Sequence, residues 1–129
     1  MALAWTIRGF ALRNGKSVID EWMDSATPQA TAKFDQRIAF LRDRKLTDWF
    51  YNYAHKRVSS GGLWEVKFEA NGIAHRPLFY LGPDDEEMTF LIFSEERNNT
   101  LKPVGCEGTA RDRMNQIEQS PTKAITYDG

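Results

Sequence analysis

The sequence predicts an α+β domain in which a mainly antiparallel four-stranded sheet packs against helices, in the order β-α-α-β-β-β-α. Two observations carry this prediction. Residues 62–97 contain three apolar runs separated by an Asn71-Gly72 step and by an acidic turn that begins at Gly82. Residues 28–45 instead have apolar side chains at helical spacing. A meander that follows a helical segment is typical of an α+β fold.

The N-terminal third is expected to form a strand and two helices. Residues 3–12 alternate in hydrophobicity and change phase at Gly9, which indicates a bulge. Ser17 is a helix cap, and Pro28 occupies the first position of a second helix that ends near Lys45. The apolar stripe of this second helix is Ala30, Phe34, Ile38 and Leu41.

Residues 46–60 are rich in aromatic side chains and allow two interpretations. Trp49, Phe50, Tyr51 and Tyr53, next to Lys56 and Arg57, have the composition of a stacking platform for single-stranded nucleic acid. The alternative, which we favour, is that the aromatic side chains cover an edge of the sheet. A short helix capped by Thr47 or Asp48 fits either interpretation.

The predicted meander consists of strands Leu63–Glu69, Ile73–Leu81 and Met88–Phe93. Asn71-Gly72 predicts a type I′ hairpin turn, because both central positions of that turn need positive φ. Pro77 cannot donate to a strand ladder, so we expect it at a bulge or at a position without a partner. Unless Pro77 shifts the register, the turn places Lys67 nearly opposite Arg76.

The C-terminal part is expected to be a loop over Ser94–Gly108 and a helix over Thr109–Gln119. Pro121 ends this helix, and residues 119–129 are predicted to be a loose tail. At 129 residues the chain is long enough for one domain, 1–129, with a core of its own.

Composition favours a cytoplasmic protein without cofactors. Cys106 is the single cysteine and cannot form an internal disulfide. The sequence contains no apolar run long enough for a bilayer, no secretory leader, no Cys/His cluster of metal spacing and no glycine-rich phosphate loop. The net charge is −1, with cations in excess over residues 33–67 and acids in excess over residues 82–118. Such a surface permits contact with nucleic acid without requiring it.

The meander also carries the polar residues with a possible chemical role. Lys67 and Arg76 together with His75 could hold a phosphodiester and move a proton, as RNA cleavage at a 2′-hydroxyl requires. The alternative, which we favour on the residues alone, is that Arg76 forms a cross-strand salt bridge with Glu65 or Glu69 and that His75 is a partly buried structural histidine.

These residues resemble a known family. Gly62–Lys67, His75-Arg76 and Phe79-Tyr80 are similar to the conserved core of the HigB-like, phage-related branch of the RelE/ParE toxin superfamily. The two N-terminal helices match that family, and Val104–Ile117 looks like its closing helix. The resemblance implies a RelE-like fold and the toxin of a type II toxin–antitoxin system. Many such toxins are ribosome-dependent mRNA endoribonucleases that inhibit translation, and the resemblance implies this activity here, together with an antitoxin that is a small helix-turn-helix protein encoded beside the toxin.

The resemblance also implies roles for individual residues. Arg76 matches the arginine that contacts the scissile phosphate, Lys67 matches a basic residue of the preceding strand, and Tyr127 stands for a C-terminal tyrosine used in acid–base chemistry. The predicted catalytic residues are therefore Arg76, His75, Lys67 and Tyr127, and the predicted RNA-binding residues are Arg97, Lys56 and Arg57.

The sequence departs from the family pattern where the family has positive charge. Glu95-Glu96 stands in place of a basic pair, Glu65 in place of lysine and His75 in place of tyrosine. These departures favour an alternative, a catalytically inactive RelE-like module of phage or mobile-element origin that engages a protein partner. The gyrase-poisoning branch of the superfamily is a third possibility. RNA specificity, the identity of the antitoxin and the oligomeric state do not follow from the sequence.

Overall fold

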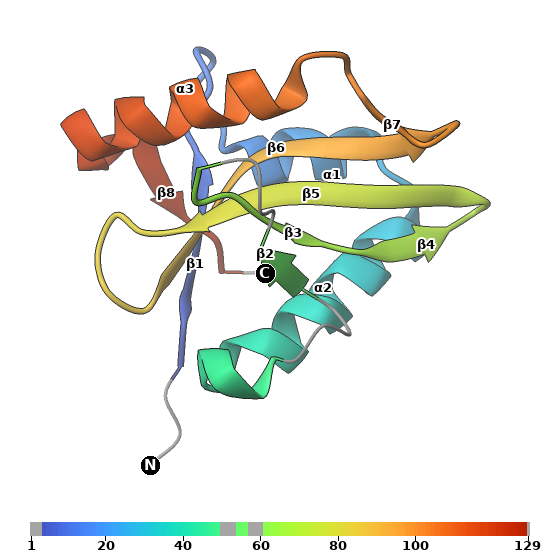
Figure 1. The fold of residues 1–129 in the computed structure, drawn as a ribbon, viewed down its shortest axis with the longest axis horizontal. Coiled ribbons are helices and arrows are strands. Elements are labelled where there is room, and N and C mark those ends of the chain that lie inside the picture. Colours follow the sequence, from blue (N-terminus) through green and yellow to red (C-terminus); the bar gives the residue numbers. More distant parts are fainter. Residues whose placement is uncertain (1–3, 50–53, 57–60, 129) are drawn as a thin grey trace.

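The structure is a computed structural model that describes residues 4–49, 54–56 and 61–128. In this part of the chain three helices accompany one mixed sheet (Figure 1). The helices and 3₁₀ turns are α1 (Val18–Ser25), α2 (Pro28–Arg42), η1 (Leu46–Asp48), α3 (Cys106–Gln119) and η2 (Pro121–Lys123). The strands are β1 (Thr6–Phe10), β2 (Ala54–Lys56), β3 (Trp64–Val66), β4 (Phe68–Ala70), β5 (Ile73–Leu81), β6 (Glu87–Arg97), β7 (Thr100–Lys102) and β8 (Ala124–Thr126).

The α+β prediction is correct, but the sheet is larger than the four antiparallel strands expected. In the described residues eight strands follow the order β2-β3-β5-β6-β1-β8, with β4 on β5 and β7 on β6. β1 runs parallel to β6 and antiparallel to β8, so the sheet is mixed. The additional strands β2, β7 and β8 have three residues each, too few to show a period of two in the sequence.

Both N-terminal helices begin as predicted. The Ser17 hydroxyl accepts a hydrogen bond from the backbone N–H of Asp20 at 3.2 Å, and the Thr27 hydroxyl accepts one from Ala30 at 3.1 Å. The bulge expected at Gly9 is absent, because β1 keeps a regular register with β6 from Thr6 to Gly9. A side chain at Gly9 would meet Ser17 and Ile19 at 3.1 Å, so glycine lets the start of α1 approach the strand.

The helices lie on opposite faces of the sheet. Trp22 of α1 stacks on Phe93 of β6 at a ring-centroid distance of 4.5 Å, and Phe34 of α2 meets Phe90 of the same strand edge-on at 5.2 Å. On the other face, Glu118 of α3 accepts a hydrogen bond from the hydroxyl of Tyr80 in β5 at 3.0 Å. Figure 1 shows α3 on one side of the strands and α2 on the other. The main core is therefore the aromatic layer under α1 and α2.

The predicted hairpin turn is confirmed. Asn71 and Gly72 have φ values of +54° and +77°, as a type I′ turn needs. The Asn71 side-chain amide donates to Gln29 Oε1 at 2.7 Å, which ties the turn to the start of α2. The register from this turn continues past Pro77, because Phe68 pairs with His75 and Glu65 pairs with Leu78.

Pro77 coincides with a break in the neighbouring strand. Lys67 separates β3 from β4 opposite this part of β5, so the ladder is interrupted where the proline has no N–H to donate. A bulge lies two residues further on, against β6: Leu78 pairs with Ile92 and Phe79 with Phe90, which leaves Leu91 of β6 without a partner.

The predicted loop Ser94–Gly108 and the predicted loose tail are corrected by the structure. β6 continues to Arg97 and turns into β7 through Asn98 and Asn99, whose φ values of +52° and +64° form a second two-residue hairpin. α3 already begins at Cys106. In the tail, Ala124–Thr126 form β8, and Tyr127 N donates to Ile7 O at 2.7 Å. Backbone pairing with β1 therefore orders a segment whose sequence shows little hydrophobic patterning.

Candidate functional site

The predicted site residues lie on two different faces of the sheet. Successive residues of a strand point to opposite faces. His75 therefore faces the aromatic layer under α1 and α2, whereas Arg76 faces the side on which α3 lies. Lys67 is exposed and shares the face of Arg76, because the register places the two residues opposite each other. The sheet thus brings Lys67 and Arg76 together and turns the His75 side chain away from them.

Arg76 is held by two carboxylates. Its Nη1 lies 3.4 Å from Glu65 Oε1, and its Nη2 is paired with Glu96. The Ser94 hydroxyl donates to the carbonyl of Arg76. Glu65 is only 2% exposed, so its charge needs a partner inside the protein. The salt bridge to Glu65 anticipated from the sequence is present, and Glu96 is a second partner that the sequence did not identify.

His75 is built into the apolar layer. Its ring stacks on Phe68 at 4.8 Å with an interplanar angle of 14°, and the edge of Trp22 approaches it at 5.9 Å. Burial lowers the pKa of the imidazole, and the charge of Glu95, its partner across β5 and β6, acts in the opposite direction. The imidazole is therefore held in its neutral form by its surroundings.

Tyr127 follows β8 and packs on the same side as α1 and α2. Its hydroxyl donates to Asp35 Oδ1 at 2.7 Å and contacts Met23 Sδ at 3.4 Å. Burial and the bond to Asp35 both raise the pKa of the phenol, so it stays protonated as a donor. The described contacts of Tyr127 join the tail to α1 and α2, while those of Arg76 lie on the opposite face.

The structure describes only some of the predicted RNA-binding and stacking residues. Arg97 ends β6 and is exposed, with its Nη2 3.1 Å from Glu95 Oε1. Lys56 lies in β2, where the structure gives its backbone position only. Arg57 lies outside the described residues, as do Phe50, Tyr51 and Tyr53. Trp49 is buried against Trp5, Trp64 and Phe79, which confirms the interpretation as sheet cover for this residue.

A shallow depression of about 340 Å³ runs along β4 and β5 and touches Lys67, His75 and Arg76. Arg37 of α2 also borders it and donates from Nε to the Lys67 carbonyl at 3.2 Å. The ring of His75 packs on Phe68 and Trp22, so the imidazole is not aligned with Lys67 and Arg76. Over the described residues, no group of three or more His, Cys, Asp or Glu side chains could hold a metal ion.

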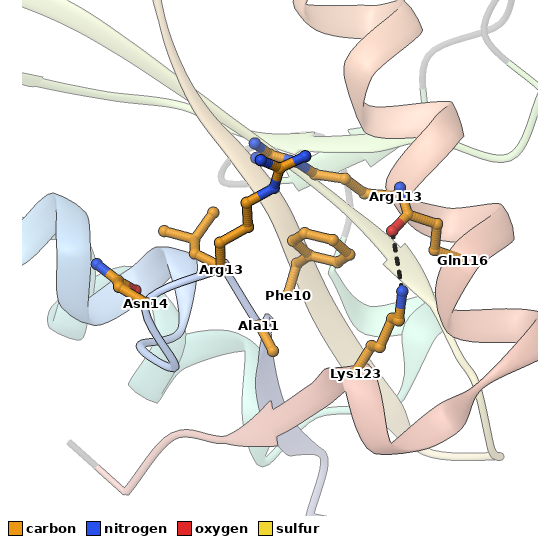
Figure 2. Close-up of a pocket in the computed structure, with 8 residues that line it drawn as sticks. Phe10, Ala11, Arg13, Asn14, Arg113, Gln116 and Lys123 are labelled. Atoms are coloured by element: carbon orange, nitrogen blue, oxygen red, sulfur yellow. Dashed lines mark hydrogen bonds between the residues drawn. The ribbon is translucent and has the colours of Figure 1, made fainter.

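A cationic cleft elsewhere in the molecule was not predicted. It is lined by the residues after β1, by α3 and by η2, and its charged side chains are Arg13, Arg113 and Lys123 (Figure 2). Arg13 lies 100 residues before Arg113 in the sequence, so no local motif joins the three side chains. The sequence offered one sign of this cleft. Arg113 is a charged residue next to Met114, and it lies between Ala110 and Ile117, which are inner positions of the predicted helix.

No protein-family model, curated protein or solved structure matches the chain. In the described part of the chain, none of the helices has both the length and the apolar character that crossing a bilayer needs.

Proposed function

We propose that this chain is a RelE-like binding module that engages a protein partner of the antitoxin type and does not cleave RNA at the Lys67–Arg76 face. The observation that carries the proposal is the position of the Arg76 guanidinium between Glu65 and Glu96. A phosphate needs an available cation, and here two carboxylates already occupy the guanidinium. An incoming phosphodiester would be repelled by the same acids.

The proton-transfer part of RNA cleavage is also unsupported on this face. A general base must reach the proton that it removes, within hydrogen-bond distance or through one water. The imidazole of His75 faces the aromatic layer, and the hydroxyl of Tyr127 is bound to Asp35. The class of partner comes from the resemblance to RelE/ParE proteins, whose function includes binding an antitoxin encoded alongside.

The first experiment measures cleavage. Purified protein is incubated with translating ribosomes and a defined mRNA, and the 5′ ends of the products are mapped. We expect no cleavage by the wild-type chain and no growth arrest when it is induced in a bacterial host. Cleavage that is lost in Arg76→Ala and kept in the surface variant Lys16→Ala would contradict the proposal.

The second experiment measures partner binding. The chain is co-expressed with the product of the reading frame encoded directly beside it, the two are co-purified, and the dissociation constant is measured by calorimetry. We expect a stable complex whose affinity is unchanged by Lys67→Ala. Absence of a complex would remove the partner part of the proposal and leave the statement on cleavage standing.

A second candidate function is the ribosome-dependent endoribonuclease toxin itself. The observation in its favour is the cross-strand placement of Lys67 opposite Arg76, with Arg37 at the edge of the same depression. In that case substrate would have to displace the acids, and Glu96→Gln would increase cleavage by freeing Arg76. A binding module shows no cleavage with or without this substitution.

A further inference from the structure

The cleft of Figure 2 is formed by residues 10–14 together with α3 and η2, which lie about a hundred residues further along the chain. The residues that follow β1 form one wall, α3 contributes Arg113 and Gln116, and η2 contributes Lys123. Its volume is about 930 Å³, within the range of about 300–1,000 Å³ that is usual for sites of small organic ligands. The ring of Phe10 and the side chains of Ala11 and Leu12 supply apolar surface.

The charge of the cleft has one sign. Arg13, Arg113 and Lys123 line it, and none of its lining residues is acidic. This is unusual for a chain whose net charge is −1. Acids occur beyond its rim on α1, where Glu21 accepts a hydrogen bond from Asn14 at 3.2 Å and Asp24 is paired with Lys16.

Arg113 is fixed before any ligand arrives. Its Nη1 donates to the carbonyl of Leu91, the unpaired bulge residue of β6, at 2.8 Å. Its guanidinium lies over the ring of Phe10, 5.0 Å from the centroid. Burial lowers its pKa, and none of the described residues gives it a carboxylate partner. A partly buried guanidinium is normally paired, so this one has a site open for an anion.

The other two cations complete the array. Lys123 donates to Gln116 Oε1 at 3.2 Å, which keeps its ammonium at the α3 side of the cleft. Arg13 is exposed and follows β1, and Figure 2 shows its side chain extending beside Phe10 toward the same part of the cleft as Arg113. Three cations therefore surround the apolar surface of the cleft: Arg113, which is fixed, Lys123, which is held by an amide, and Arg13, which is exposed.

We propose that this cleft binds a phosphate ester of nucleotide size, either a free nucleotide or a nucleotide unit of an RNA chain. The planar fork of a guanidinium matches a phosphate group with two parallel N–H···O bonds, and two guanidinium groups border the cleft. The volume leaves room for the remainder of a nucleotide next to Phe10 and Leu12. This site is separate from the Lys67–Arg76 face and does not depend on the partner proposed above.

The test uses the full chain and three probes: inorganic phosphate, AMP, and a decamer of uridylate with a 3′ fluorescent label. Calorimetry measures the first two and fluorescence anisotropy the third. We expect Arg13→Ala and Lys123→Ala each to weaken binding of the responding probe, by roughly tenfold for the loss of one phosphate contact. Lys102→Ala and Lys16→Ala are the matched controls, because both remove an exposed cation outside the cleft and are expected to change nothing.

The source of the phosphate ester follows from the probes. Binding of AMP at least as tight as that of the decamer identifies a free nucleotide. Binding of the decamer alone identifies RNA, and Lys123→Ala then reduces the slope of log K against log salt by about 0.7, as expected for one phosphate contact to a single strand. Binding of inorganic phosphate alone, no binding of any probe, or equal loss in the control variants overturns the proposal. Circular dichroism confirms that each variant is folded.

Discussion

The imidazole of His75 lies flat on the ring of Phe68, with a centroid distance of 4.8 Å and an interplanar angle of 14°. The two residues are direct partners across β4 and β5. Because His75 and Arg76 are neighbours in one strand, the same alternation that brings His75 onto Phe68 turns the Arg76 guanidinium to the other face. The stack thus separates the predicted base from the predicted phosphate ligand.

His75→Phe should make the stability of the protein less dependent on pH. An unfolded histidine has a pKa of about 6.5, and burial lowers the pKa of folded His75. Between the two pKa values the unfolded chain therefore binds more protons than the folded chain. As the pH is lowered from about 6.5 to the folded pKa, the free energy of unfolding decreases by ~1.4 kcal/mol for each pH unit. Urea unfolding from about pH 7.5 to about pH 5.5 measures this slope.

The wild-type chain, measured over the same pH range, is the control. Equal slopes in wild type and His75→Phe would mean that His75 titrates normally in the folded protein.

Arg76→Gln should destabilise the fold more than loss of a surface arginine. Glu65 and Glu96 each lose a positive partner, and Glu65 is almost fully buried. Removing one member of a buried ion pair costs about 3–5 kcal/mol, and since the Arg76 side chain is 22% exposed we expect roughly 2 kcal/mol. Arg97→Gln, which removes an exposed pair to Glu95, should cost ~0.5 kcal/mol or less.

Chemical denaturation of the two variants makes this comparison. Adding Glu96→Gln to Arg76→Gln should recover part of the lost stability, because it removes the Glu96 charge that Arg76 no longer balances. If Arg76→Gln and Arg97→Gln have the same free energy of unfolding, the ion pairs of Arg76 contribute nothing to the fold.

Tyr127→Phe should lower stability without affecting any activity on RNA. The phenol donates to Asp35 at 2.7 Å, and a hydrogen bond to a charged acceptor contributes about 1.5–3 kcal/mol when well shielded. Because the site is partly exposed, we expect a loss of about 1 kcal/mol. In a double-mutant cycle with Asp35→Asn the losses should be non-additive. Additive losses would show that the two groups do not interact in solution.

The sequence predicted the elements whose signals are local. Asn71-Gly72 carries the residue types that a type I′ turn demands, and Ser17 and Thr27 are caps next to apolar helical patterns. The Asn98-Asn99 hairpin uses the same backbone conformation, but asparagine without glycine is a weaker signal and the three residues before the turn, 95–97, are all charged. β8 depends on pairing with β1, more than a hundred residues away, and could not be read from three residues.

In the candidate site, too, local features were predictable from the sequence and features that depend on distant segments were not. The register that sets Lys67 opposite Arg76 follows from the turn and was predictable. The second ion pair of Arg76 requires β6 to extend at least to Glu96, which pairs with Ala74 of β5 and with Leu101 of β7. The cleft around Arg113 depends on β1, α3 and η2 meeting in space, which only the tertiary structure shows.

Alanine substitutions at two glycines on the α3 side of the sheet should change the stability of the protein with opposite signs. A Cβ built at Gly82 lies 2.4 Å from Cε2 of Tyr80, whose buried ring carries the hydroxyl bound to Glu118. Gly82→Ala must therefore displace the ring or the turn, and we expect a loss of about 1–3 kcal/mol, the range for an overpacked site. Gly108 of α3 has no atom within 4 Å of its built Cβ, so Gly108→Ala should stabilise the helix by roughly 0.5–1 kcal/mol through propensity alone.

Urea unfolding of both alanine variants measures the difference in sign. Tyr80→Phe isolates the hydroxyl: it removes the bond to Glu118 and leaves the contact with residue 82 in place. If Gly82→Ala acts by displacing the ring, the tyrosine hydroxyl should no longer contribute in that background, so Tyr80→Phe should cost less there than in the wild type. An unchanged cost would mean that the turn moves and the ring stays.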